Sequence, residues 1–226
     1  MRGIDGLLRG ESSESAASLG SLVRAVFILG GFYGVCMGLF AAMRGSHGTA
    51  WQMPASALKI PLLFLLTLLV TFPSLYVFSA LSRSTMQFTA SLHLLIRAIT
   101  VSIALLASFD PITAFFTLST SSYPFMVLLN VALFTVAGLA GMKYLGSALE
   151  SVFESADPPP TARRLGQDRA SRILRNWIYI YGAVGAQMAW ILRPFVGSPD
   201  LPFTLFRDRE SNFFLGVLES IRQLFQ

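Results

Sequence analysis

The chain has 226 residues, of which 54% are hydrophobic and only 13% are charged, and its net charge is +5. About a quarter of the residues in soluble domains are charged, so this composition argues against an ordinary soluble enzyme. Apolar stretches of about 20 residues recur, which is the length that crosses a bilayer as a helix. They lack the alternation that is typical of outer-membrane strands. We therefore expect an all-α, polytopic membrane helix bundle with about five transmembrane helices.

The N-terminal part of the chain predicts four membrane spans behind a polar segment. Residues 1–23 are polar and include acidic side chains, so we expect them in the cytoplasm and not as a cleavable signal peptide. The four-span membrane region covers residues 24–143, and its spans run over about 25–43, 60–81, 93–118 and 123–143. Pro61 is expected in the first turn of the second span, and Pro73 is expected to kink that span.

The third span contains the dipeptide Asp110-Pro111. Asp followed by Pro is typical of the start of a helix. We therefore expect the span either to kink at this point or to end there, with a short interfacial helix following it.

A cytoplasmic loop is predicted over residues 144–176. Its first part can continue the fourth span as a polar helix, and the proline run at residues 158–160 then stops any helix. A basic stretch follows, which we expect to lie against anionic lipid headgroups. Its members are Arg163, Arg164, Arg169 and Arg172.

The C-terminal part predicts a fifth span over residues 177–194 and an extracytoplasmic segment over residues 195–226. The first part of this segment is rich in proline and aromatic residues, which favours a packed cap over the outer mouth of the bundle. From Ser211 onward the apolar residues follow helical spacing, with polar residues opposite. We expect an amphipathic helix there, which lies in the outer headgroup layer or binds a groove on a partner.

The distribution of basic residues indicates the orientation in the membrane. With five spans, eleven of the 17 Lys and Arg residues fall on one side and six on the other. The positive-inside rule places the richer side, which includes the N-terminus, in the cytoplasm and the C-terminus outside. The same bias explains the basic net charge without a nucleic-acid partner. We expect a multi-pass protein of the cell inner membrane.

Three glycines of the first span, Gly30, Gly34 and Gly38, are spaced four residues apart and share one face of the helix. Glycines at this spacing allow the backbone of another helix to come close. Packing inside the bundle is one interpretation of this face. A partner interface or an oligomerisation face is the other.

Asp110 is an acidic residue inside a long apolar stretch. A carboxylate in hydrocarbon must be paired, neutral or close to the interface. Asp110 can form an ion pair with Arg193, because spans three and five end on the same side. It can instead cap a short helix, and both alternatives stay open. Two histidines and one cysteine provide too few ligands for a metal site, and no catalytic or phosphate-binding motif is present. We expect no enzyme activity, no metal and no cofactor.

Two features resemble known membrane proteins. The segment Gln187–Phe195, continued by residues 209–214, resembles a segment shared by uncharacterised bacterial multi-spanning membrane proteins. The architecture over residues 24–192 is similar to that of the Yip1-type family, with Phe32-Tyr33-Gly34 in the first span and Lys59-Ile60-Pro61 opening the second. This resemblance implies clustered spans, an outward C-terminus and a role in membrane trafficking or organisation rather than catalysis.

Two functional hypotheses follow. The first is a non-enzymatic integral membrane protein that acts as a scaffold or accessory subunit of a membrane complex. Its partners would be membrane lipids and other integral membrane proteins or a second copy of itself. The alternative is a transporter or permease component with a site near Asp110 and Arg193. A transporter needs a polar cavity through the bundle, whereas a scaffold can be packed solid.

Overall fold

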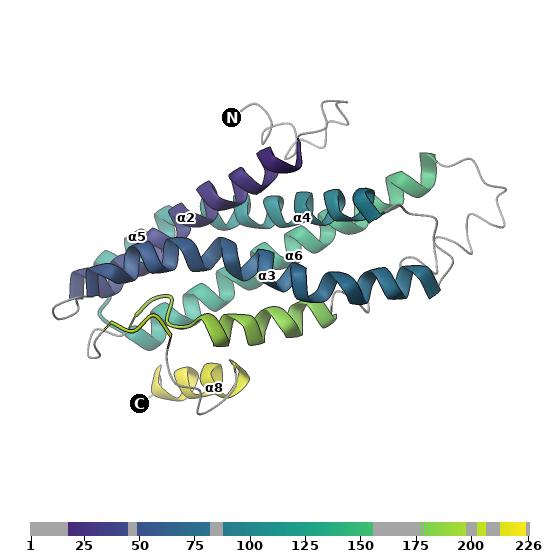
Figure 1. The fold of residues 1–226 in the computed structure, drawn as a ribbon. Coiled ribbons are helices and arrows are strands. Elements are labelled where there is room, and N and C mark those ends of the chain that lie inside the picture. The colour runs from purple at the N-terminus through teal and green to yellow at the C-terminus, as the bar shows by residue number, and fades with distance from the viewer. Residues whose placement is uncertain are drawn as a thin grey trace.

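The computed structural model describes most of the chain, in the residue ranges 18–44, 49–81, 88–155, 177, 179–197, 203–206 and 213–224. Those ranges contain no strand. Their elements are α2 (Leu19–Arg44), the short 3-10 helix η1 (Thr49–Trp51), α3 (Gln52–Leu81), α4 (Phe88–Ser108), α5 (Asp110–Ser119), α6 (Tyr123–Ser155) and α8 (Phe213–Leu224). Residues 179–192 are helical as well. The long helices run alongside one another as a bundle (Figure 1).

Four stretches of helix are long and apolar enough to cross a membrane. They cover Leu19–Arg44, Gln52–Ser74, Leu92–Ser119 and Tyr123–Ala148. These ranges contain most of each of the first four predicted spans, so the predicted all-α membrane bundle is confirmed. Large apolar side chains such as Phe32, Leu69 and Leu139 stay exposed on the outside of the bundle, where a bilayer would cover them. The fifth predicted span is helical over residues 179–192.

Two helices extend beyond their predicted limits. α6 continues to Ser155, as the predicted polar continuation of the fourth span requires. α3 starts at Gln52 and not near residue 60, so Pro61 lies inside the helix and its prediction for the first turn is wrong. The additional turns bury Gln52 and Ser56, whose side chains bond to backbone carbonyls of the segment after residue 192. Membrane helices tolerate an internal proline when neighbouring helices pack against it.

The third span is interrupted where the Asp-Pro dipeptide predicts. α4 ends at Ser108, Phe109 has φ −88° and ψ 0°, and α5 begins at Asp110 with a proline in its first turn. Both pieces belong to one apolar stretch, Leu92–Ser119. The interruption therefore lies inside a single candidate span.

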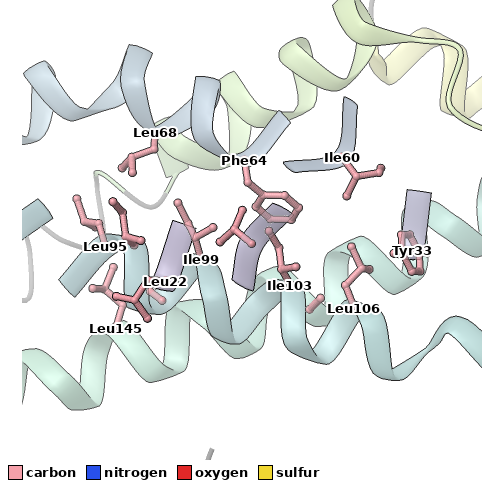
Figure 2. Packing of buried hydrophobic residues seen from close by; sticks show 14 of the residues in the cluster. Leu22, Tyr33, Ile60, Phe64, Leu68, Leu95, Ile99, Ile103, Leu106 and Leu145 are labelled. Carbon is pink, nitrogen blue, oxygen red and sulfur yellow. The ribbon is translucent and has the colours of Figure 1, made fainter. Parts of the chain in front are cut away.

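α2 packs against α3, α4 and α5, and its largest interface is with α3. Figure 2 shows buried apolar side chains that join α2, α3, α4 and α6. The ring of Tyr33 in α2 meets that of Phe134 in α6 edge to face, with centroids 5.7 Å apart. Phe134 in turn stacks on Phe64 of α3, with centroids 5.9 Å apart. One aromatic cluster thus holds three helices together.

The three glycines of α2 lie against the N-terminal half of α3. A Cβ atom placed on Gly34 would lie 2.6 Å from the Cα of Ala57, and one on Gly38 would lie 2.7 Å from the carbonyl oxygen of Gln52. A Cβ on Gly30 would lie 3.3 Å from the ring of Pro61. The close helix–helix contact is therefore made inside the chain, and α3 covers this face against any partner.

We predict that Gly34→Ala destabilises the bundle, because its methyl group overlaps backbone atoms of α3. Overpacking of this kind costs about 1–3 kcal/mol. The control is Gly138→Ala on α6, where a Cβ meets nothing within 4 Å. This control should be neutral or stabilising by up to about 1 kcal/mol, because alanine favours the helix. The measurement is the midpoint of thermal unfolding in mild detergent, and equal midpoints for the two variants would contradict the contact.

Candidate functional site

A group of polar side chains lies where α5 meets α2 and α6. The hydroxyl of Tyr33 donates a hydrogen bond of 2.6 Å to Oδ1 of Asn130, and Nδ2 of Asn130 donates one of 2.7 Å to the carbonyl of Met126. The carboxyl group of Asp110 lies beside the thiol of Cys36. Thr113, one turn further along α5, lies beside Tyr33. We call Tyr33, Cys36, Asp110, Thr113 and Asn130 the carboxyl–hydroxyl cluster.

Three oxygen atoms on one face of α5 are buried without a hydrogen-bond partner. They are Oδ1 of Asp110, Oγ1 of Thr113 and Oγ1 of Thr117. Both threonines have 0% of their surface exposed, which makes an unused hydroxyl costly. The spacing of three and then four residues aligns the three side chains along the helix.

Other buried threonines in the bundle behave differently. Thr67, Thr71 and Thr100 each donate their hydroxyl to the carbonyl four residues earlier, at 2.6, 2.7 and 2.8 Å. This local bond is the usual way for a membrane helix to satisfy a threonine. Thr113 and Thr117 make no such bond, so α5 carries a face of polar oxygens that the protein itself leaves unused.

Asp110 has neither of the roles that the sequence leaves open for it. The N-cap of α5 is Phe109, no side chain caps this helix end, and Asp110 lies in the first turn. In the described part of the chain no interaction joins Asp110 to Arg193, whose guanidinium instead stacks on the ring of Trp190 at 3.6 Å. The ion pair, one of the two alternatives, is therefore not found between these described residues.

A second group of polar side chains lies on α3 and is not anticipated by the sequence analysis. Gln52, Ser56 and Lys59 are buried, and Lys59 has only 4% of its surface exposed. Spacings of four and three residues place all three on one face of the helix, which is the signal that could have identified them. We call these three residues the α3 clamp.

The α3 clamp binds the segment that follows the helix at residues 179–192. Gln52 donates to the carbonyls of Pro194 and Phe195 at 2.8 and 3.0 Å, and Ser56 also donates to that of Phe195. Lys59 donates to the carbonyls of Pro194 and Leu205 and lies 5.3 Å from the ring centroid of Phe206.

Packing also fixes this segment in place. Val196 is buried, and Gly197 has a φ of +74° with Ala41 and Gln52 so near that a side chain would clash. Residues 193–197 thus form a packed segment against α3, whereas Leu205 and Phe206, which contact Lys59, have 52% and 56% of their surface exposed.

The C-terminal end of α5 is tied to α2 by Arg44. Its guanidinium donates to the carbonyls of Thr117 and Leu118, the latter at 3.2 Å, and lies 5.1 Å from the ring centroid of Phe40. A cation is favourable at this end of a helix because the carbonyls there carry partial negative charge. Arg44 therefore closes the end of α5 toward which the face of unused oxygens leads.

The remaining predicted residues lie elsewhere or outside the described residues. Arg163, Arg164, Arg169 and Arg172, which are expected at lipid headgroups, fall outside the described residues. α8 is amphipathic as predicted, contacts α6 and exposes Phe214, Leu215 and Leu218. In the described ranges no group of three His, Cys, Asp or Glu side chains is arranged to hold a metal ion.

Comparisons of the chain with protein-family models, with curated proteins and with solved structures found no match. The likeness to the Yip1-type family therefore stays an expectation.

We predict that Lys59→Met loosens the segment after residue 192, because it removes the donors for the carbonyls of Pro194 and Leu205. Leaving a buried acceptor unsatisfied costs about 1–3 kcal/mol. The control is Lys143→Met, since Lys143 is exposed on α6. Thermal unfolding and hydrogen exchange over residues 195–206 are the measurements. Unchanged exchange in Lys59→Met would show that the α3 clamp does not hold this segment.

We also predict that Tyr33→Phe destabilises the bundle, because Oδ1 of Asn130 then loses its donor in the core. The expected loss is about 1–3 kcal/mol. Tyr179→Phe is the control, since 70% of that side chain is exposed. The measurement is the midpoint of thermal unfolding in detergent. If Tyr33→Phe lowers this midpoint no more than the control does, the buried hydrogen bond between α2 and α6 is contradicted.

Proposed function

We propose that this chain is a non-enzymatic, membrane-embedded component of a transporter or permease, with its site at Asp110. The observation that carries the proposal is a carboxylate at the break of an interrupted span, beside buried hydroxyls without partners. Ionisable groups inside membrane helices are costly and are typical of ion and substrate pathways. Interrupted spans recur in transporters, where the ends of the half-helices contact substrate and coupling ions.

The depth of Asp110 supports this proposal. Nine residues separate Asp110 from the end of α5 at Ser119. At 1.5 Å per residue this is about 14 Å, or roughly half of an apolar layer of about 30 Å. Thr113 and Thr117 line the same face between Asp110 and that end of the helix. This row of oxygens lies between Asp110 and the end of α5 that Arg44 covers.

A scaffold or accessory subunit is the second candidate, and α6 is the observation that favours it. Only 22% of the α6 span is buried in the bundle, compared with 44% for each of the other three. The glycine face of α2 no longer supports this role, because α3 covers it. The two candidates differ in whether water reaches Asp110.

We predict that water reaches Asp110, and Cys36 provides the test. It is the one cysteine of the chain and lies beside Asp110. In proteoliposomes, a charged maleimide that cannot cross the membrane should label Cys36 from one side only. The control is Cys36→Ala combined with Leu139→Cys, which places the thiol on an exposed apolar face of α6. Lipid should protect that thiol from the charged reagent.

The comparison reagent is a membrane-permeant maleimide. If Cys36 reacts with the permeant but not with the charged reagent from either side, the interior is packed and dry. That result overturns the transporter proposal and favours the scaffold. Labelling by the charged reagent at a rate no greater than that of the control thiol has the same meaning.

A further inference from the structure

We propose that Asp110, Thr113 and Tyr33 form a buried site for one monovalent alkali cation. The inference deepens the proposed function, since it names the ion that an Asp110-based transporter component would bind. It depends on three observations: an uncompensated carboxylate, hydroxyl oxygens without partners, and a helix break at the same place.

The negative charge of Asp110 is the first reason to place a cation here. Asp110 lies in the first turn of α5, where the helix dipole favours an ionised carboxylate. No basic side chain bonds to Asp110 in the described part of the chain, and the guanidinium of Arg44 bonds to carbonyls at the opposite end of α5. A lone negative charge inside an apolar span needs a positive charge or a proton.

The oxygen atoms of Asp110, Thr113 and Tyr33 are the second reason, because they are of the type that binds an alkali cation. Tyr33 uses its hydrogen to bond Asn130, so the lone pairs of its oxygen stay available as acceptors. Oγ1 of Thr113 lies beside this hydroxyl without a hydrogen bond of normal geometry, although the residue is fully buried. Carboxylate and hydroxyl oxygens are the ligands that hard cations prefer. An alkali cation would bind the lone pairs of the Asp110, Thr113 and Tyr33 oxygen atoms that accept no hydrogen bond in the described chain.

The interruption of the helix at Phe109 is the third reason to place a cation here. The carbonyl end of α4 stops at Ser108, directly before Asp110. The last carbonyls of a helix carry partial negative charge, and those of α4 come directly before Asp110 in the chain. Broken helices that bind Na+ combine these same elements, a side-chain carboxylate or hydroxyl and the carbonyl end of a half-helix.

The charge count also selects the class of cation. One carboxylate neutralises one positive charge, whereas a divalent ion would leave an excess charge in the apolar layer. Transition metals favour His and Cys ligands, and the cluster contributes only the thiol of Cys36. A proton would neutralise Asp110 but would not use the hydroxyl of Thr113, and the experiment separates the two.

The test measures thermal unfolding of the full chain in detergent while Na+ or K+ replaces choline at constant ionic strength and pH. A ligand that binds the folded state raises the midpoint in a saturable way. We expect such a rise with one of the two alkali cations. Asp110→Asn should abolish it, and Thr113→Val should weaken the apparent affinity about tenfold or more, because a ligand oxygen is lost.

Two variants control for folding. Thr100→Val removes a buried hydroxyl that is satisfied within α4, and it should keep the cation response of the unaltered chain. Thr113→Ser keeps the ligand oxygen, and it should keep the response even if Thr113→Val proves too unstable to measure. Binding of radioactive ²²Na+ to the purified protein gives an independent affinity when Na+ is the active cation.

Several outcomes would overturn the inference. One is a midpoint that does not distinguish alkali cations from choline, and another is a response that survives in Asp110→Asn. A midpoint that follows pH but no alkali cation would make Asp110 a proton site. Because the Cys36 labelling does not depend on which ion binds, labelled Cys36 without an alkali response would overturn the cation site and keep the transporter proposal.

Discussion

The close approach of α2 and α3 determines where the other groups of this bundle lie. At Gly34 and Gly38 the two backbones touch, because neither glycine has a side chain that would separate them. Lipid supplies no hydrophobic force between membrane helices, so contact of this kind is a principal source of their association. Once the glycine face is set against α3, the rotation of α2 is fixed. Tyr33 and Cys36, on other sides of α2, then face α5 and α6.

The bundle contains a buried ammonium group and a half-buried carboxyl group that do not pair with each other. The ammonium group of Lys59 is satisfied inside the chain by two carbonyls and the face of Phe206. The carboxyl group of Asp110 has no such set of partners, and one of its oxygens is buried and unbonded. Lys59 thus has a structural role, since it fastens the segment after residue 192 to α3. Removing the Asp110 carboxylate from water costs free energy, and no bond within the described chain offsets that cost. This is the physical reason to assign it a ligand.

Much of the architecture could be predicted from the sequence, because membrane spans are local features. The length of each apolar stretch is compared with the thickness of the bilayer, and this requires no knowledge of neighbouring helices. The break before Asp110 was predictable for the same reason, since a proline acts on its own turn. The start of α3 was not predictable in this way. Its first turns are held by bonds from Gln52 and Ser56 to a segment more than a hundred residues later.

The sequence by itself determined the helical membrane bundle, the interrupted third span and the ability of the α2 glycines to accept a close neighbour. Each of these follows from residue type and spacing within one segment. Only the tertiary structure decided that α3 fills the glycine face, that Asp110 and Arg193 do not pair, and that Thr113 and Thr117 keep their hydroxyls unused. These outcomes depend on which face of each helix meets which neighbour. Hydropathy and spacing leave that rotation open, because lipid and protein interiors are equally apolar.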